Sequence, residues 1–112
     1  MISNVNNIKL YYEKRGEGRP LILLHGNGES HKIFDEAIEI LEKNFTVYAI
    51  DLRGHGASED IEEYHYLDMV EDIKEFIYTE KLVEPILYGF SDGGIIALLL
   101  ASMYPRMLSR II

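Results

Sequence analysis

The sequence predicts an α/β protein, with a mostly parallel β-sheet covered by helices on both faces. From residue 20 onward, short apolar runs alternate with segments in which apolar residues recur at helical spacing. This alternation is typical of a parallel sheet. The apolar runs are continuous, which favours strands that are buried on both faces. Each run also leads into a loop that contains glycine, where the chain can turn sharply into the next helix.

The first half of the chain is expected to supply a hairpin, two strands and a helix. Residues 8–14 and the segment before them predict a hairpin that turns near residues 4–7. The apolar runs at residues 20–24 and 45–50 predict buried strands. Between these strands, apolar residues at helical spacing predict a helix over about residues 31–43. The residues at this spacing are Ile33, Phe34, Ala37, Ile38 and Leu41.

The second half is expected to supply two further helices, one strand and the start of another. The first of these helices is amphipathic, with apolar residues on one face and acidic residues opposite. Its apolar face contains Leu67, Val70, Ile73 and Ile77, and its acidic face Asp68, Glu71, Asp72 and Glu75. Residues 85–88 predict a strand, and residues 94–104 a helix that ends before Pro105. Residues 110–112 are expected to begin another strand.

Composition limits the class of protein. A chain of 112 residues forms one domain at most, and the absence of cysteine excludes disulfides and thiolate chemistry. The formal net charge of −8 argues against nucleic acid or an anionic membrane as partner. The first residues show no signal-peptide pattern, and the longest apolar run, about seven residues, is too short to span a membrane. We therefore expect a soluble cytoplasmic protein. The acidic residues Glu59, Asp60, Glu62 and Glu63 are expected to lie in a solvated loop.

The most informative motif is the run Gly89-Phe90-Ser91-Asp92-Gly93-Gly94. It lies between an expected strand and an expected helix, which is the context in which G-x-S-x-G indicates a nucleophile elbow. A sharp turn there would expose Ser91, and Gly89 and Gly93 would allow the neighbouring backbone to pass close by. The backbone N–H of Asp92, at the start of the helix, would face a developing oxyanion. The alternative is a Gly-Ser turn that only caps a helix.

Two further motifs follow the other apolar runs. His25-Gly26-Asn27-Gly28-Glu29 comes directly after residues 20–24, and Asp51-Leu52-Arg53-Gly54-His55-Gly56 after residues 45–50. A glycine-rich loop at the carboxyl end of a strand can turn backbone N–H groups toward an oxyanion.

With these three motifs in this order and at this spacing, the chain resembles the α/β-hydrolase superfamily. The resemblance covers residues 1–112, from the first hairpin to the start of the sixth strand, and implies the N-terminal half of an α/β-hydrolase domain. It implies that Ser91 is the nucleophile and that the backbone N–H groups of Asn27 and Asp92 form the oxyanion hole. It implies a structural role for nine loop residues. These are His25, Gly26, Asp51, Arg53, Gly54, His55, Gly56, Gly89 and Gly93.

The resemblance also implies the type of reaction. A serine at this position points to hydrolysis of a small carboxylic ester, thioester or amide through an acyl-enzyme on Ser91. Dehalogenases and epoxide hydrolases of the superfamily use a carboxylate there, so their chemistry is not expected. No organic cofactor and no metal is implied, and segments that come later in the superfamily's chains build most of the substrate pocket.

The order of a serine triad in this superfamily is Ser, then Asp or Glu, then His. After Ser91 the sequence holds one acid, Asp92, and no histidine. The acid and base of the triad therefore have no counterpart, and we expect the chain alone to be a poor hydrolase. His25 and His55 lie in loops at the same sheet edge, but are expected to lock their own loops. His31 and His65 are expected to be surface residues without a role.

The truncated sheet also has consequences for partners. Residues 86–88 are expected to form an open apolar edge, which is a template for pairing with another chain. We therefore expect self-association or a complementing C-terminal fragment.

Three other interpretations remain open. Gly26 and Gly28 followed by Asp51 imitate a dinucleotide-binding fingerprint, although His31 stands where its third glycine belongs. The chain could be a non-catalytic remnant or an interaction fragment. A metal site from His25, Asp51 and His55 would have a spacing that matches no standard ligand pattern.

Overall fold

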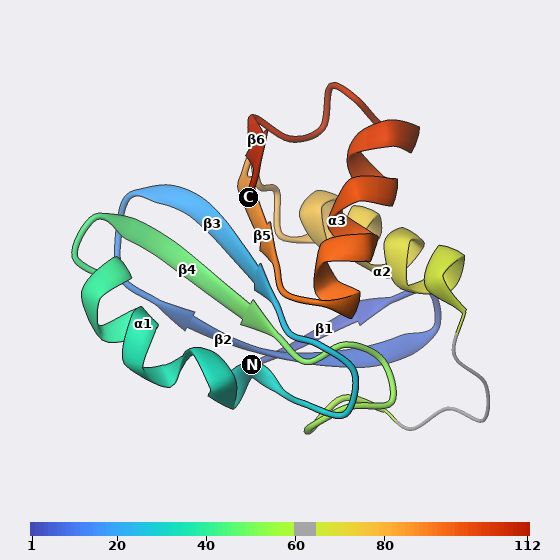
Figure 1. Cartoon of the computed structure of the whole chain (residues 1–112), viewed down its shortest axis with the longest axis horizontal. Coiled ribbons are helices and arrows are strands. Elements are labelled where there is room, and N and C mark those ends of the chain that lie inside the picture. The colour runs from blue at the N-terminus through green and yellow to red at the C-terminus, as the bar shows by residue number, and fades with distance from the viewer. Residues whose placement is uncertain (60–64) are drawn as a thin grey trace.

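A computed structural model describes residues 1–59 and 65–112. The described chain forms a six-stranded sheet in the order β1-β2-β4-β3-β5-β6, with helices on both faces (Figure 1). The strands are β1 (Ile2–Val5), β2 (Ile8–Arg15), β3 (Arg19–Leu24), β4 (Phe45–Ile50), β5 (Ile86–Gly89) and β6 (Arg110–Ile111). The helices are the 3₁₀ turn η1 (His31–Phe34), α1 (Asp35–Leu41), α2 (Tyr66–Thr79) and α3 (Asp92–Met103). The predicted fold class is confirmed.

Strand pairing brings the three motif loops to one edge of the sheet. β1, β2 and β4 pair antiparallel, whereas β4, β3, β5 and β6 run parallel. In the parallel part, Leu24 stands opposite Ile50 on one side and Gly89 on the other. The carboxyl ends of β3, β4 and β5 are therefore level, and the loops that follow them emerge side by side.

The period of two along each strand divides the core into two layers. Leu21 and Leu23 pack with Val47 and Ala49 on the face that α1 covers. Ile22 and Leu24 point to the opposite face, together with the buried side of α2 and α3. In Figure 1, α1 lies on one side of the sheet and α2 and α3 lie on the other.

The first hairpin turns at Asn6 and Asn7, which have φ angles of 47° and 65°. Two adjacent residues with positive φ are typical of a tight hairpin turn, and asparagine tolerates this conformation better than most residues. The helix expected over residues 31–43 is shorter and begins as the 3₁₀ turn η1. Helix α3 begins at Asp92, two residues earlier than expected, because the turn at Ser91 leads directly into it.

The expectation of an open edge at β5 is wrong. Residues at the end of the chain pair with β5 in parallel, with Ile86 opposite Arg110 and Leu87 opposite Ile111. The backbone N–H of Ile112 donates to the carbonyl of Leu87 at 2.9 Å. Even two strand residues are enough to occupy the backbone groups of β5, so β6 becomes the edge of the sheet.

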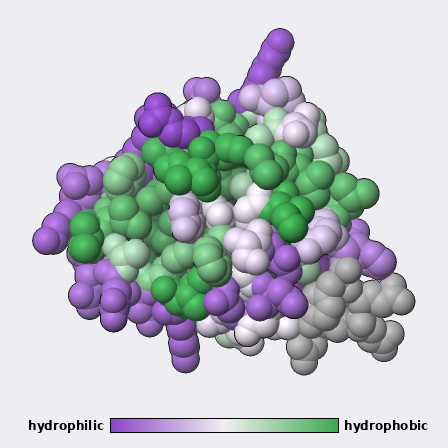
Figure 2. All heavy atoms as spheres, viewed as in Figure 1, coloured by the Kyte–Doolittle hydropathy of each residue, from purple (hydrophilic) through white to green (hydrophobic). Residues whose placement is uncertain are grey.

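The surface around this edge is apolar. Figure 2 shows apolar side chains gathered over the region of β5, β6 and α3. Leu98 and Ile112 there are 60% and 66% exposed. None of the helices in the described ranges is long and apolar enough to cross a membrane. Asp60, Glu62 and Glu63 of the expected acidic loop lie outside the described residues.

Candidate active site

The backbone at Ser91 has an unusual conformation. Ser91 lies between the end of β5 and the first residue of α3, with φ 56° and ψ −115°. Residues other than glycine rarely adopt such a backbone conformation, because it costs on the order of 1–3 kcal/mol and persists only where the surrounding structure imposes it. The Ser91 side chain is exposed at this turn.

Two glycines make this turn possible. A Cβ atom on Gly89 would lie 2.1 Å from the carbonyl oxygen of Gly93, and one on Gly93 would lie 2.3 Å from that of Leu24. Either side chain would force backbone apart, because both contacts are far shorter than van der Waals distance. The glycines two residues before and after Ser91 are therefore required by the close approach of β5, α3 and the end of β3.

The loop after β3 lies directly beside the serine. A Cβ atom on Gly26 would lie 3.2 Å from the Cβ of Ser91. The Gly26 N–H donates to Glu29 Oε1 at 2.8 Å, and the Glu29 N–H donates to the Gly26 carbonyl at 3.2 Å. These reciprocal bonds fix the shape of the loop that lies beside Ser91.

His25 is fully buried and both of its ring nitrogens are engaged. Nε2 accepts from the Leu52 N–H at 3.0 Å, so Nδ1 carries the proton and donates to the Gly26 carbonyl at 2.7 Å. Burial lowers the pKa of this histidine, because the charged form would be desolvated. In this arrangement His25 joins the loops after β3 and β4 and offers no free nitrogen to Ser91.

Two backbone donors remain beside the serine. Among the described residues, neither the Asn27 N–H nor the Asp92 N–H donates to a protein acceptor. Both residues line a cavity of about 270 Å³, which Tyr66 and Met69 complete. Chemically, such donors at a helix N-terminus and a glycine-rich loop can stabilise an oxyanion.

The loop after β4 is organised around the buried carboxylate of Asp51. Its oxygens accept from the His31 N–H at 2.7 Å, from His31 Nδ1 at 2.8 Å and from the Ala57 N–H at 2.8 Å. A Cβ on Gly56, where φ is 51°, would lie 2.2 Å from Asp51 Oδ2. The His55 Nδ1 lies 3.0 Å from the Arg53 carbonyl, and its ring centroid lies 5.0 Å from that of His25.

Arg53 leaves this loop and forms an ion pair with α2. Its Nε and one terminal nitrogen donate to the two oxygens of Asp72 at 2.6 and 2.7 Å. Asn6 adds a third donor to the same carboxylate at 3.1 Å. The assignment of Asp72 to the solvent face of its helix is therefore wrong: the residue is 1% exposed, because Arg53 and the β1–β2 turn cover it.

The expectation that His31 is a surface residue is also wrong. It is buried and bound to Asp51, and its ring lies 5.4 Å from that of Tyr11. The sequence held a signal for this position, since His31, Phe34 and Ile38 follow helical spacing and all three are buried.

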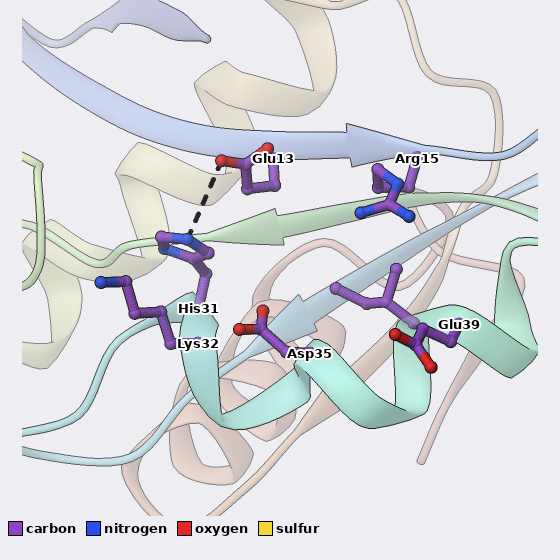
Figure 3. Close-up of a pocket in the computed structure, with 7 residues that line it drawn as sticks. Glu13, Arg15, His31, Lys32, Asp35 and Glu39 are labelled. Atoms are coloured by element: carbon purple, nitrogen blue, oxygen red, sulfur yellow. Dashed lines mark ion pairs between the residues drawn. The ribbon is translucent and has the colours of Figure 1, made fainter.

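A second, polar groove lies beside His31, between β2 and the segment η1–α1 (Figure 3). It has a volume of about 430 Å³ and its walls carry charges of both signs. His31 Nε2 is 3.9 Å from a carboxylate oxygen of Glu13. The groove shares no residue with the cavity at Asn27 and Asp92. Its mixed charges are typical of a solvated surface, so we assign no chemistry to it.

The geometry of the loop after β4 argues against a dinucleotide-binding site and against a metal site in the described residues. The carboxylate of Asp51 is fully buried and occupied by three donors, so it is not available to a ribose hydroxyl. Across residues 1–59 and 65–112, no group of three histidine or acidic side chains is placed to hold a metal ion.

The fold and the site together define a class. The described chain is an α/β protein whose parallel strands end in three adjacent loops, one of which carries a strained residue between a strand and a helix. The family model described as "alpha/beta hydrolase fold" matches residues 19–112. The chain belongs to the α/β-hydrolase family.

Individual relatives agree with this assignment. The chain is 41% identical over 99 residues to the AB hydrolase superfamily protein YisY of Bacillus subtilis, covering 87% of this chain and 37% of the relative. It is 30% identical over 103 residues to a pimeloyl-[acyl-carrier protein] methyl ester esterase of Vibrio parahaemolyticus, covering 92% and 39%. A crystal structure of an epoxide hydrolase mutant from Bacillus megaterium superposes with a TM-score of 0.94 at 28% identity, covering 99% and 40%.

These comparisons define a general hydrolase family and leave the reaction open, since an esterase and an epoxide hydrolase are both similar to the chain. The chain spans less than two fifths of the length of these two curated relatives.

Proposed function

We propose that the chain carries the nucleophile and the oxyanion hole of a serine hydrolase that cleaves carboxylic esters, thioesters or amides. The observation that carries this proposal is the strained backbone of Ser91 at the strand-to-helix turn. Such strain persists only where the surrounding structure imposes it, and it is concentrated at functional sites. A serine, instead of a carboxylate, at this turn favours acyl transfer over epoxide opening.

The reaction would proceed in two steps. The Ser91 oxygen attacks the carbonyl carbon while its proton passes to a base, and the backbone N–H groups of Asn27 and Asp92 stabilise the oxyanion. The intermediate expels the alcohol, thiol or amine, which takes up a proton. Water then cleaves the Ser91 acyl bond, releases the acid and restores the hydroxyl.

His25, the buried histidine of the loop beside Ser91, is not free to act as the base of this reaction. His25 uses both ring nitrogens in loop hydrogen bonds, and no histidine follows Ser91 in the sequence. We propose that a complementing segment supplies the base and its acid, covalently joined or as a separate chain. The greater length of the relatives is consistent with such a segment.

A chimera tests this proposal. Residues 1–112 replace the aligned segment of YisY, and the chimera is assayed with p-nitrophenyl acetate. We expect turnover that the Ser91→Ala chimera loses by at least about a thousandfold, because removal of a triad nucleophile costs at least that much. We expect the 112-residue chain alone to be far slower, since only the oxyanion hole remains.

The controls separate folding from chemistry. Circular dichroism and thermal melting establish that both chimeras fold equally well. Turnover that survives in Ser91→Ala, or an acyl group found by peptide mapping on another residue, would contradict the assignment of Ser91.

A further inference from the structure

The carboxylate of the residue that follows Ser91 lines a cavity that Ser91 itself does not line. Asp92 follows the serine directly, and it lines the cavity of about 270 Å³ together with Asn27, Tyr66 and Met69. Asn27 and Asp92 are the two proposed oxyanion donors, so a carbonyl oxygen bound to their N–H groups would lie beside this cavity, whereas Ser91 lines a separate apolar cavity with Ile95 and Leu98. A charged group that extends from that carbonyl into the cavity of Asn27 and Asp92 would lie near the Asp92 side chain.

This carboxylate has one hydrogen-bond donor and no cationic partner among the described residues. The Tyr66 hydroxyl donates to Asp92 Oδ1 at 2.8 Å, which raises the pKa of Tyr66 because the bond favours the neutral phenol. Oδ2 makes no hydrogen bond within the described ranges, and no lysine or arginine there lies within ion-pair distance. The contrast is Asp72, both of whose oxygens accept hydrogen bonds from the Arg53 guanidinium.

We propose that Asp92 makes this site selective for acyl groups that carry a positively charged group, such as a primary ammonium. The proposal rests on the proposed function of Ser91. A carboxylate without a cationic partner attracts a cation in the substrate and repels an anion. The expected preference is roughly three- to tenfold, since the side chain is partly exposed and water screens the interaction.

Internal competition measures this preference without requiring turnover. The 112-residue chain is incubated at pH 7 with equal amounts of the p-nitrophenyl esters of 3-aminopropanoate and butanoate. The two acyl groups have the same shape, with NH₃⁺ in one and CH₃ in the other. Acylation forms the bond from Ser91 Oγ to the carbonyl carbon, releases p-nitrophenolate and gives the serine proton to solvent. Peptide mapping by mass spectrometry gives the ratio of the two adducts on Ser91.

The ratio is compared between the wild type, Asp92→Asn and the matched control Glu36→Gln, which removes one charge from the exposed surface of α1. The comparison cancels the difference in intrinsic reactivity of the two esters. We expect Asp92→Asn to lower the ratio of cationic to neutral adduct roughly three- to tenfold. We expect Glu36→Gln to leave it unchanged, and 0.5 M salt to lower it in the wild type and in Glu36→Gln but not in Asp92→Asn.

Two results would overturn the inference in different ways. Equal ratios in the wild type and in Asp92→Asn, with clear adducts on Ser91, would refute the role of Asp92 and leave the proposed function intact. The absence of an adduct on Ser91 both in the 112-residue chain and in the acid-quenched YisY chimera, which supplies a base, would refute the nucleophile itself, and the selectivity with it.

Discussion

At the scale of single residues, the site depends on one strained position and the glycines that impose it. Ser91 has a positive φ at a turn where β5, α3 and the end of β3 approach so closely that Gly89 and Gly93 have no room for a Cβ. The fold therefore accepts a local cost at the residue where the proposed chemistry takes place.

Replacing Ser91 by glycine should increase stability. Glycine adopts this conformation without strain, which stabilises the folded state by on the order of 1–3 kcal/mol. Its greater conformational freedom in the unfolded chain destabilises the folded state by about 0.5–1 kcal/mol. We expect a net gain of about 1 kcal/mol in the free energy of unfolding, measured with urea. The control Ser102→Gly, an exposed position within α3, should instead lose about 0.5 kcal/mol. A loss of stability in Ser91→Gly would contradict the strain.

At the scale of elements, side chains tie the motif loops to the helices around them. Arg53 connects the loop after β4 to α2 through a bidentate pair with Asp72, and Asn6 connects the first hairpin to the same carboxylate. His25 connects the loops after β3 and β4. The edge that carries Ser91 is thus a set of loops joined by buried polar bonds.

Breaking the Arg53–Asp72 pair from one side should destabilise the protein strongly. Arg53→Met leaves the carboxylate of Asp72 buried without its counter-charge, and we expect a loss of about 3 kcal/mol in the free energy of unfolding. The double variant Arg53→Met, Asp72→Leu should recover part of this loss. The control Arg15→Met breaks a pair with Glu42 in which the Arg15 side chain is 52% exposed and that of Glu42 30% exposed, so it should cost less, about 1 kcal/mol. Similar losses in Arg53→Met and Arg15→Met would mean that burial of the Arg53–Asp72 pair does not increase the cost of breaking it.

Local sequence patterns predicted the elements better than the contacts between them. Apolar runs and helical spacing gave the order of strands and helices, because these patterns arise within one element. The burial of Asp72 and His31 depends on Arg53 and Asp51, which belong to other elements. An acidic residue opposite an apolar face is normally solvated, so only the assembled structure reveals its partner. In the same way, the sequence showed the start of β6 but not that it pairs with β5.

At the scale of the whole molecule, both faces of the sheet are incompletely covered near β6. On the side of α3, an apolar cavity of about 360 Å³ is lined by Ile95, Leu98 and Ile112, and Ser91 also lines it. On the side of α1, another of about 250 Å³ contains Leu23, Tyr88 and again Ile112. Ile112 at the edge of the sheet therefore lies between two apolar hollows. Contiguous exposed apolar surface of this kind is typical of an interaction site.

The isolated chain should consequently associate with copies of itself through this edge. A second copy would bury Leu98 and Ile112, and the sheet edge at β6 would offer backbone groups for pairing. We expect the weight-average sedimentation coefficient to rise with protein concentration, and Leu98→Glu to suppress that rise because a charge would have to be buried at the contact. The matched control is Ile40→Glu on α1, where the native side chain is 70% exposed but lines neither hollow. A wild type that sediments as a monomer at every concentration and melts cooperatively would contradict self-association through this edge. If both variants suppress the rise in sedimentation coefficient equally, the cause is the added negative charge. A specific contact at the β6 edge would be disrupted by Leu98→Glu and not by Ile40→Glu.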